Sequence, residues 1–411
     1  MPDDEGPEKE MDQEHVQITI ETTNGRTHLT GEAPRQNVDE EEEESLESDE
    51  DTDEDTDEDM DEDMDEDMAG TDVEVRVEMA RPPKHADRDI AAIDDEISLP
   101  MDEGDRYPGW RVGLPRKLGA YVELIRPFTL LAPLFGGLGA SLLALSSQDF
   151  EGFSWPTLIY GVVTLMLLNA ASNCMNAAYD AHIDRINKPY RPIPKGLVTR
   201  DEAFSIAFLL YFVAFVRAML ISVEFWALVT IITIITIYYS MPPVRFKKRF
   251  WVSNISIALA RGLLGFVAAW SIFGDPSDPT PWVIGGILFI YLVGATTSKD
   301  FTDIEGDREF GMRTLPVVYG PKRAALVTGP FFILPFIFIP LGVLRGYLID
   351  ASNYLMVLMV WGIYVMVLLQ NHATERDPNF ENSPVWKHMY LMLFALQIGF
   401  AVVYVGDYWL N

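Results

Sequence analysis

PTLIYGVVTLMLLNAASNCMNAAYDAHID, residues 156–184, joins an apolar run of membrane-spanning length to ionised side chains. Asn176, Asp180 and Asp184 recur every four residues, so a helix places them on one face. A helix that starts at Pro156 would carry these carboxylates at its C-terminal end, where the helix dipole disfavours anions. Carboxylates beside a membrane span are costly and are therefore candidates for function. A bound cation would remove the penalty.

A second acidic cluster with similar spacing follows 120 residues later, at Asp300, Asp303 and Asp307. Two such clusters on different helices are suited to hold Mg²⁺ against a diphosphate, because Mg²⁺ binds through a few carboxylates together with substrate phosphates. Neutralising a diphosphate leaving group allows its C–O bond to ionise to an allylic carbocation, which needs a dry, electron-rich pocket. We therefore predict a Mg²⁺ cofactor. The predicted catalytic residues are Asp180, Asp184, Asp303 and Asp307, and the predicted metal ligands add Asn176 and Asp300.

Cations and polar groups surround both clusters and extend along the same set of loops. Lysine and arginine in these positions can take the remaining phosphate charge. The predicted substrate-binding residues are Arg126, Lys188, Arg191, Lys195, Tyr239, Lys247, Asn254, Lys299 and Arg308. Arg261 lies in the same predicted span as Asn254, and both are expected to face a cavity, because buried polar groups in lipid are costly. Structural roles stay open for several of them. The acidic groups can cap helix ends and pair with nearby arginines, the basic loop at Lys247 can orient the protein, and Arg126 can extend toward lipid headgroups.

The chain divides by charge into two unlike parts. Residues 1–106 hold 42 Asp and Glu against 8 Lys and Arg, whereas residues 107–411 hold 20 against 23. The acidic repeat Asp51–Met68 repels itself and cannot bury a core, which predicts disorder for the segment 1–106. Asn24-Gly25 is a local hairpin-turn signal within it. We predict a disordered acidic tail over 1–106, whose protein partners the sequence leaves unknown, and a membrane domain over 107–411.

The membrane domain consists of long apolar runs, and a span needs about 20 apolar residues. The fold class predicted is all-α, a polytopic bundle of about nine transmembrane helices. The predicted spans are Leu124–Leu145, Pro156–Tyr179, Ala203–Ser222, Phe225–Ser240, Trp251–Phe273, Trp282–Thr297, Ala324–Leu344, Tyr354–Leu369 and Met389–Trp409.

Basic residues gather in alternate loops, after the second, fourth and sixth predicted spans and before the first. The positive-inside rule places those loops and the N-terminus in the cytoplasm. Both acidic clusters then lie on the cytoplasmic side of a multi-pass protein in the cell membrane. The expected partners are membrane lipids, a prenyl diphosphate and a small-molecule or lipid acceptor, with no nucleic acid. Cys174 is the only cysteine, which excludes a disulfide within the chain.

These motifs resemble the UbiA-type intramembrane prenyltransferases over roughly Tyr121 to Gly320. The family's first aspartate-rich motif matches Asn176 to Asp184, and the NKPYRPIPKG stretch that follows matches at 187–196. The Tyr-Ser-x-Pro-Pro-x-Arg-x-Lys pattern matches 239–247. The second aspartate-rich motif matches 300–316, including its Glu-Gly-Asp-Arg and Thr-Leu-Pro tail. Ala177 stands where many members have a further aspartate.

The resemblance implies nine helices around a membrane-embedded cavity, with Mg²⁺ and diphosphate at its cytoplasmic mouth. It implies transfer of a prenyl group, geranylgeranyl by preference, to an acceptor, with release of diphosphate. Known acceptors in the family include glycerophosphate ethers and aromatic precursors of quinones. From the carboxylates alone, two other functions stay open. One is a Mg²⁺-dependent lipid phosphotransferase, although its usual Asp-Gly-x-x-Ala-Arg run is missing, and the other is a transporter, which would place carboxylates deep within the spans.

Overall fold

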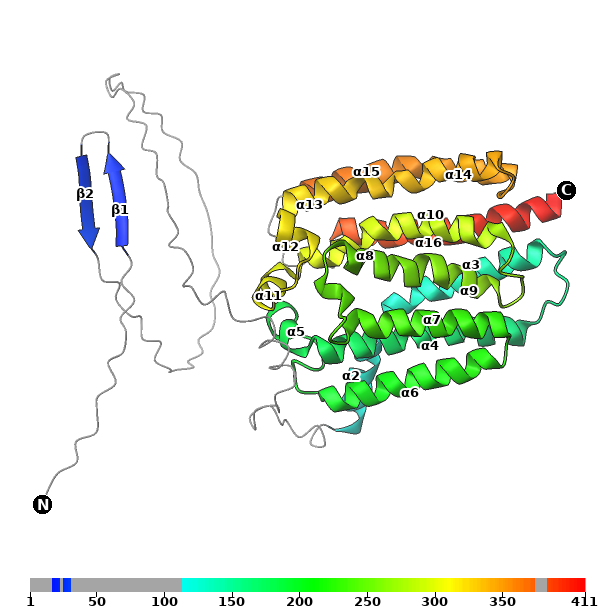
Figure 1. The fold of residues 1–411 in the computed structure, drawn as a ribbon, viewed down its shortest axis with the longest axis horizontal. Coiled ribbons are helices and arrows are strands. Elements are labelled where there is room, and N and C mark those ends of the chain that lie inside the picture. The colour runs from blue at the N-terminus through cyan, green and yellow to red at the C-terminus, as the bar shows by residue number, and fades with distance from the viewer. Residues whose placement is uncertain (1–16, 23–24, 31–112, 374–382, 411) are drawn as a thin grey trace, which may run out of the picture. The chain divides into compact units, whose positions relative to one another are not determined.

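The computed structural model describes residues 17–22, 25–30, 113–373 and 383–410, in which the chain forms a small hairpin and a bundle of helices (Figure 1). The hairpin belongs to one compact unit, Met1–Ala86, and the bundle to a second, Asp87–Asn411.

The hairpin consists of two antiparallel strands, β1 (Gln17–Thr22) and β2 (Gly25–Thr30). Thr22 pairs with Gly25, so Gly25, which the sequence predicted to lie in a hairpin turn, belongs to the second strand. A hairpin is thus present where the sequence predicted one. The acidic repeat and the predicted domain boundary at residue 106 lie outside the described residues, so disorder of the tail and this boundary stay predictions.

Nine helical stretches in the described part of the chain are long and apolar enough to cross a membrane, which confirms the predicted all-α polytopic fold. The stretches are Pro127–Ser146, Trp155–Tyr179, Arg200–Met219, Val223–Ser240, Trp251–Trp270, Pro279–Phe301, Pro321–Leu344, Asp350–His372 and Pro384–Leu410. Each one overlaps a predicted span. In Figure 1 these helices run side by side along one direction.

Several spans are built from more than one helical segment. The first four spans are η3 (Pro127–Leu130) with α3 (Leu131–Ser146), α4 (Trp155–Tyr179), α6 (Arg200–Met219) and α7 (Val223–Ser240). The fifth and sixth are α8 (Trp251–Ala258), η5 (Leu259–Leu263) and α9 (Leu264–Trp270), then α10 (Pro279–Ala295) with η6 (Thr296–Phe301). The last three are α13 (Pro321–Thr328), η7 (Gly329–Phe332) and α14 (Leu334–Leu344), then η8 (Asp350–Val357) with α15 (Leu358–His372), then α16 (Pro384–Leu410).

Short helices lie in the connections. They are α2 (Leu114–Ile125) before the first span, α5 (Ala181–Asn187) after the second, η4 (Phe246–Lys248) after the fourth, and α11 (Ile304–Glu309) and α12 (Leu315–Tyr319) after the sixth. Figure 1 shows α2, α5, α11 and α12 at the same end of the bundle. The loops that carry the acidic motifs therefore meet there.

The first span begins later than the sequence predicted. The apolar run was expected to be helical from Leu124, but α2 ends at Ile125 and Arg126 adopts a left-handed conformation with φ 58°. Pro127, whose ring fixes φ and which lacks a backbone N–H, then starts the span as a separate helix. Hydropathy alone cannot locate such a break, because both sides of it are apolar.

Side-chain caps set where three spans begin. Ser154 accepts a hydrogen bond from the Thr157 backbone N–H, and Ser222 accepts one from Phe225. Thr199 and Glu202 form a reciprocal capping box at the start of α6. Ser222 therefore divides what reads in the sequence as one apolar stretch into α6 and α7.

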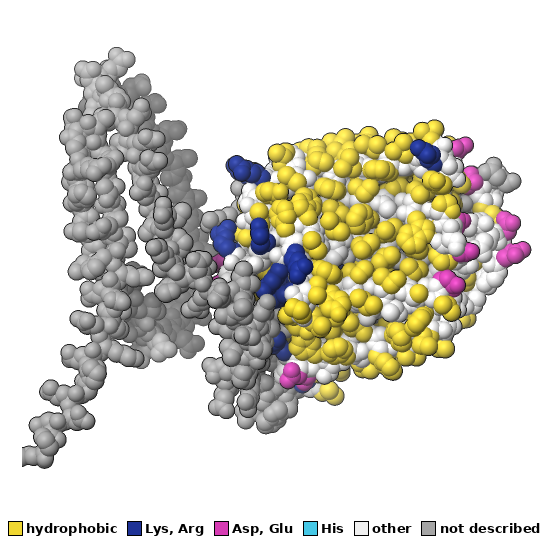
Figure 2. Space-filling model, viewed as in Figure 1, with side chains coloured by type: hydrophobic (Ala, Val, Ile, Leu, Met, Phe, Trp, Pro, Cys, Tyr) yellow, Lys and Arg dark blue, Asp and Glu magenta, His cyan; other side chains and the backbone are white. Residues whose placement is uncertain are grey.

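The bundle carries an apolar belt between two charged ends. Figure 2 shows hydrophobic side chains covering its flank, with Lys and Arg gathered mainly toward one end and Asp and Glu toward the other. This pattern suits a helical bundle that crosses a lipid bilayer. The basic end is the end at which α5 and α11 lie.

The first and last spans pack closely because α3 has a glycine at the contact. A Cβ on Gly139 would lie 2.7 Å from the backbone oxygen of Gln397 on α16. Backbone cannot retreat as a flexible side chain can, so the contact requires a residue without a side chain. Small residues at helix contacts are a common means of packing spans in lipid.

We expect Gly139→Ala to lower the thermal unfolding temperature of the purified protein. The added methyl overpacks the contact between α3 and α16, at a cost of about 1–3 kcal/mol. Gly286→Ala on α10 is the matched control, because nothing lies within 4 Å of a Cβ at that position. Equal unfolding temperatures for the two variants would contradict this packing.

Candidate active site

One cavity of about 360 Å³ brings the two acidic clusters together. The residues of the clusters come from elements that are far apart in the sequence, namely the end of α4 with α5, and the end of η6 with α11. All six of the predicted metal ligands line the cavity, which are Asn176, Asp180, Asp184, Asp300, Asp303 and Asp307. The carboxylates lie at helix ends, whereas a transport path would need them deep within the spans.

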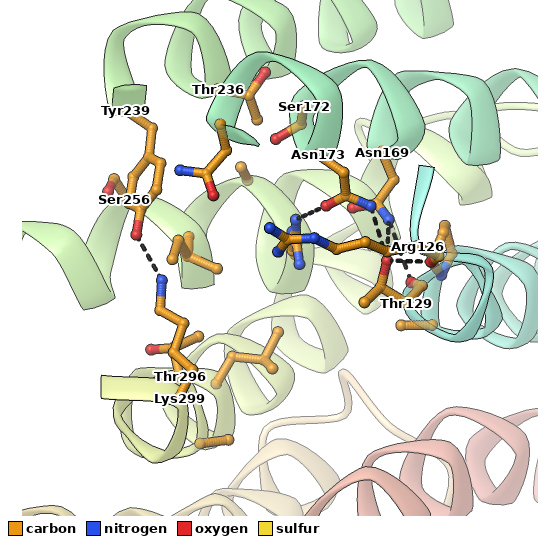
Figure 3. A pocket seen from close by; sticks show the side chains of 18 of the residues that line it. Arg126, Thr129, Asn169, Ser172, Asn173, Thr236, Tyr239, Ser256, Thr296 and Lys299 are labelled. Atoms are coloured by element: carbon orange, nitrogen blue, oxygen red, sulfur yellow. Dashed lines mark hydrogen bonds between the residues drawn. The ribbon is translucent and has the colours of Figure 1, made fainter. Parts of the chain in front are cut away.

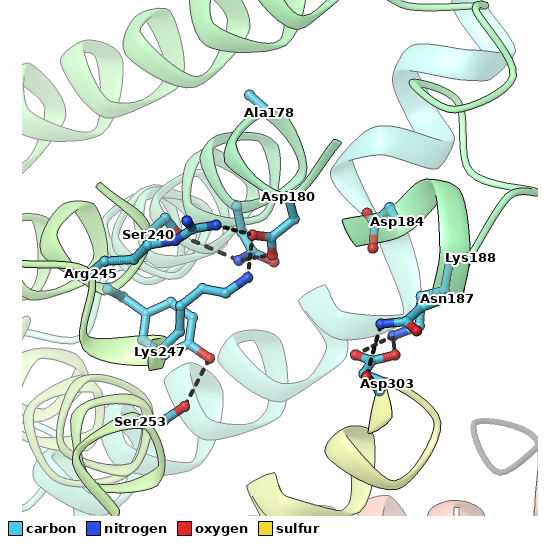
Figure 4. A network of polar contacts seen from close by, with 12 residues as sticks. Ala178, Asp180, Asp184, Asn187, Lys188, Ser240, Arg245, Lys247, Ser253 and Asp303 are labelled. Carbon is cyan, nitrogen blue, oxygen red and sulfur yellow. Dashed lines mark hydrogen bonds and ion pairs between the residues drawn. The ribbon is translucent and has the colours of Figure 1, made fainter. Parts of the chain in front are cut away.

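Asp180 is buried directly after α4, where it ends the helix. Its carboxylate accepts hydrogen bonds from the Lys247 ammonium, from Asn176 Nδ2 at 2.8 Å and from Arg245 Nη2 at 3.5 Å (Figure 4). Burial alone would raise the pKa of Asp180, but the charges of Lys247 and Arg245 outweigh it and hold the pKa below its usual value. Asp180 therefore carries a stable negative charge.

Asp184 follows one turn later on α5 and is also buried. Arg191 binds it in a bidentate manner, with Nη1 at 2.9 and 2.8 Å from the two carboxylate oxygens. Burial nevertheless raises the pKa of Asp184, the Asp180 carboxylate raises it further, and Arg191 only partly offsets these effects. The two carboxylates of the first motif thus differ in their electrostatic setting.

The second cluster is paired with cations from other loops. Lys188 Nζ lies 2.5 and 2.7 Å from the two carboxylate oxygens of Asp303, an ion pair that joins the first motif to the second (Figure 4). Burial raises the pKa of Asp307 to about 7, with further contributions from the Asp303 and Asp300 carboxylates. The Lys299 ammonium donates to Tyr239 Oη at 2.6 Å, and this oxygen lies 3.3 Å from Ser253 Oγ (Figure 3 shows the Lys299–Tyr239 pair).

Backbone contacts tie the three motif loops to one another. Asn187 Nδ2 donates to the Asp303 carbonyl at 3.0 Å, and the Gly306 N–H donates to Asn187 Oδ1 at 2.8 Å. The Arg313 N–H donates to the Lys248 carbonyl at 3.3 Å, which joins the loop after α7 to the segment before α12. A Cβ at position 306 would lie 2.7 Å from the Asn187 amide, so glycine there lets the amide keep its bonds to α11.

A second, neutral group of polar side chains lines the wall beside Arg126 (Figure 3). Asn173 Nδ2 donates to Thr129 Oγ1 at 2.8 Å and to the Ile125 carbonyl at 2.9 Å, and Asn169 Nδ2 donates to the Thr129 carbonyl at 3.2 Å. These bonds satisfy the backbone groups freed where Arg126 and Pro127 interrupt the helix. They also hold this break against α4.

Six of the nine predicted substrate-binding residues line the cavity, namely Arg126, Lys188, Arg191, Tyr239, Lys247 and Lys299. The other three do not. Lys195 and Arg308 are exposed outside it, so their predicted contact with substrate is not supported by this geometry. Asn254 was expected to face the cavity from the fifth span, but it is buried between helices and donates to Thr297 Oγ1 at 2.6 Å and to the Val293 carbonyl at 3.2 Å. Its hydrogen bonds thus serve to pack α8 against α10.

Sequence reasoning missed two residues that contribute here. Arg245 contacts Asp180, and Asn187 joins the loops. Both lie within the motifs that contain Lys247 and Lys188, so their place in these motifs could have pointed to them. Arg261, in the same span as Asn254, was expected to face the cavity because an arginine within an apolar span is costly, and it does line the cavity.

No three His, Cys, Asp or Glu side chains among the described residues form a ready-made metal site. The cause is visible in the pairing, because Asp180, Asp184 and Asp303 each contact a cation. Mg²⁺ does not need a cage of protein ligands, since it usually binds through one or two carboxylates together with water and substrate phosphates. The cavity therefore offers hard oxygen ligands to a metal that arrives together with a phosphate group.

Comparisons with known proteins agree on one family. The model of the UbiA prenyltransferase family matches residues 130–400. The chain is 31% identical over 289 residues to the digeranylgeranylglyceryl phosphate synthase of Thermococcus gammatolerans, covering 69% of this chain and 98% of that protein. It is 27% identical over 285 residues to the synthase of the same name from Methanosphaera stadtmanae, covering 69% and 99%.

Solved structures show the same fold. A UbiA homologue from Archaeoglobus fulgidus bound to GPP and Mg²⁺ superimposes with a TM-score of 0.55 at 23% identity, covering 70% of this chain and 99% of that chain. A digeranylgeranylglyceryl phosphate synthase structure gives a TM-score of 0.50 at 23% identity, covering 69% and 99%.

We expect Gly306→Ala to loosen the contact between α5 and α11. The added Cβ displaces the Asn187 amide and removes the bonds that cross between the two motif loops. Hydrogen–deuterium exchange of the purified protein should then speed up at residues 181–187 and 303–309. Glu305→Ala, an exposed neighbour on α11, serves as the control. Unchanged exchange in the Gly306 variant would show that Asn187 does not hold these loops together.

Proposed function

This chain belongs to the UbiA prenyltransferase family, and we propose that it transfers a geranylgeranyl group from its diphosphate to a glycerophosphate ether in a Mg²⁺-dependent reaction. The observation that carries the proposal is the single cavity in which both acidic clusters meet their interleaved cations. The acceptor is supported by the relatives from Thermococcus and Methanosphaera, which are digeranylgeranylglyceryl phosphate synthases. Family membership also decides against the phosphotransferase and the transporter.

The residues at the mouth suit a metal–diphosphate pair. When bound, Mg²⁺ would offset the diphosphate charge and so make the leaving group a better one. Asp180 and Asp184 from one motif and Asp300, Asp303 and Asp307 from the other would hold it, with Asn176 as a neutral oxygen ligand. These residues come from the ends of α4 and η6 and from α5 and α11, so a diphosphate between them is approached from two sides.

Cations that now pair with the carboxylates supply the remaining positive charge. Lys188, Arg191 and Lys247 each contact an aspartate and line the same cavity. With a metal bound by the carboxylates, these three cations would be available as donors for phosphate oxygens. Lys299 joins them from η6, where its hydrogen bond to Tyr239 orients the ammonium group.

The rest of the cavity gives the prenyl chain a dry environment. Apolar side chains from α4, α7 and α9, such as Leu165, Ile232 and Phe266, line it below the charged mouth. Phe128, Trp386 and Tyr390 pack against one another there, with ring centroids 4.7–5.0 Å apart. Excluding water protects a carbocation from hydrolysis, and aromatic faces stabilise its positive charge.

We propose that the basic end of the bundle and both acidic motifs face the cytoplasm. The support is the gathering of Lys and Arg at that end, which the positive-inside rule assigns to the cytoplasm. Cysteines introduced at Lys195 and Lys248 of a Cys174-free protein should react with a membrane-impermeant reagent only in opened vesicles. A cysteine at Ser277, in the loop between the fifth and sixth spans, should react in intact cells. The opposite pattern would reverse the orientation.

The function is tested by transfer assays on the purified protein in lipid nanodiscs. With geranylgeranyl diphosphate and geranylgeranylglyceryl phosphate, we expect product only with Mg²⁺, none with chelator, and recovery when Mg²⁺ is restored. Asp180→Asn and Asp303→Asn should each lower kcat/KM by roughly 100-fold or more, because each loses charge without losing volume. Glu305→Gln is the control, since Glu305 is an exposed acid that does not line the cavity. Transfer to an aromatic acid but not to the glycerophosphate would overturn the acceptor.

The Mg²⁺ requirement should also depend on pH. Asp307 has a pKa of about 7 because it is buried beside other carboxylates, so it is protonated below pH 7 and ionised above it. Protons then compete with the metal at low pH, and the Mg²⁺ concentration for half-maximal activity should be about tenfold higher at pH 6 than at pH 8. In Asp307→Asn this difference should largely disappear. A requirement that is flat between pH 6 and pH 8 in the unmodified protein would exclude Asp307 as a ligand.

A further inference from the structure

Arg261 lies ten residues into the fifth span, which runs from Trp251 to Trp270. At a rise of about 1.5 Å per residue, its backbone is about 15 Å along the helix from the charged end. A guanidinium at that depth is expensive unless it faces water or an anion. Its side chain lines the cavity and is exposed to it, so the cost is not removed by burial against other helices.

The charge of Arg261 is not neutralised by the protein. Its Nη2 donates to Asn173 Oδ1 at 3.3 Å, and no carboxylate among the described residues forms an ion pair with it. Arg217, for comparison, donates to Thr164 Oγ1 at 3.0 Å and to the Tyr160 carbonyl at 2.8 Å, and lies 3.6 Å from the centre of the Tyr160 ring. A guanidinium has five N–H donors, so Arg261 keeps most of them for a ligand.

The backbone is built to aim this side chain. Arg261 lies at the centre of η5, a π-helical segment within an otherwise α-helical span. Such segments insert a residue into the helix and frequently mark functional sites. Gly262 lets the widened turn approach α10, where a Cβ would lie 2.9 Å from the Phe289 backbone. The segment therefore turns Arg261 away from α10 and toward the cavity.

The surroundings of Arg261 differ from the metal-binding mouth. Asn173, whose oxygen accepts from Arg261, is itself fixed by its two bonds to Thr129 and the Ile125 carbonyl. Asn173 precedes Asp180 by seven residues on α4, which is about 10 Å along the helix. The three partners of Asn173 in these hydrogen bonds are the Arg261 guanidinium, the Thr129 hydroxyl and the Ile125 carbonyl, and none of them is a carboxylate. Figure 3 shows Asn173 and Thr129 beside Arg126 and Asn169. This part of the wall attracts an anion directly through arginine.

We propose that Arg261, oriented by Asn173, binds the phosphate of the acceptor. The inference rests on the proposed function, because it takes the acceptor to be a phosphate monoester. The guanidinium fork matches phosphate oxygens in geometry and charge. A phosphate held here lies on the membrane side of the diphosphate site, where the first carbon of the prenyl chain must also lie. Arg126, which lines the same wall, adds positive charge to this subsite.

The test separates the two substrates kinetically. Full-length protein in nanodiscs is assayed with Mg²⁺, varying geranylgeranyl diphosphate and geranylgeranylglyceryl phosphate in turn. Arg261→Met keeps an unbranched apolar stem but removes the guanidinium and its charge, so the KM for the acceptor should rise about 10- to 100-fold. The KM for the diphosphate should stay within about twofold, and Arg261→Lys should restore part of the acceptor affinity. Arg217→Met is the matched control, because Arg217 is also an intramembrane arginine but does not line the cavity.

A binding measurement distinguishes this inference from the proposed function. Calorimetry compares geranylgeranylglyceryl phosphate with its dephosphorylated alcohol, and 4-hydroxybenzoate serves as an aromatic anion. The unmodified protein should prefer the phosphate, and Arg261→Met should lose that preference. If the protein transfers only to the aromatic acid, the proposed function fails, and the anion subsite survives only if 4-hydroxybenzoate binding weakens equally in Arg261→Met. An unchanged preference, or an equal rise in the KM for diphosphate, overturns the inference.

Discussion

Asp180 lies buried at the end of α4, in contact with the Lys247 ammonium and within 3.5 Å of Arg245. A carboxylate removed from water at a membrane boundary must be neutralised, and losing one partner of such a buried pair typically costs about 3–5 kcal/mol. Asp184 with Arg191 and Asp303 with Lys188 repeat the arrangement. The pair of Asp184 and Arg191 lies within one loop, whereas Asp180 with Lys247 and Asp303 with Lys188 join loops from distant parts of the sequence. The pairs that cross between loops help to hold the three loops together at one end of the bundle.

The same ion pairs also bear on how the site would bind a metal and a diphosphate. Carboxylates and cations pair with each other in this structure. Under the proposed function, the carboxylates would turn to a metal and the cations to a diphosphate. Binding would then exchange protein–protein ion pairs for protein–metal and protein–phosphate ones, which lowers the cost of bringing a highly charged group to a membrane cavity. Arg261 differs, because its hydrogen-bond partner among the described residues is the neutral Asn173. Because no carboxylate among the described residues neutralises Arg261, we assign the acceptor phosphate to it.

Much of the fold and part of the candidate site could be predicted from the sequence. Apolar runs gave nine spans because burial in lipid demands length and composition rather than specific neighbours. The spacing of Asn176, Asp180 and Asp184 predicted a shared face because helical periodicity is local. The pairing of Lys188 with Asp303 could not be predicted, since it depends on how two loops 115 residues apart fold together.

Two residues lie elsewhere than the sequence led us to expect. Asn254 was expected in the cavity, but polarity within a span does not distinguish a ligand from a bond between helices, and the side chain contacts Thr297. Lys195 lies in a motif, yet its side chain is exposed and does not line the cavity. The break at Arg126 and the π-helical turn at Arg261 arise from backbone geometry, which apolar periodicity does not record.

The exchange of ion pairs is tested most directly by calorimetric titration of Mg²⁺ into the full-length protein with and without inorganic pyrophosphate. When a metal binds the carboxylates, the cations that were paired with them are free to bind pyrophosphate, and the reverse also holds. Each ligand should therefore raise the affinity of the protein for the other, and by thermodynamic linkage the two increases must be equal. We expect Mg²⁺ affinity, corrected for Mg²⁺–pyrophosphate association in solution, to rise about tenfold or more with pyrophosphate present. Lys247→Met, which leaves Asp180 with one cation fewer, should bind Mg²⁺ alone more tightly and show weaker coupling. Independent binding of the two ligands in the unmodified protein would contradict the account.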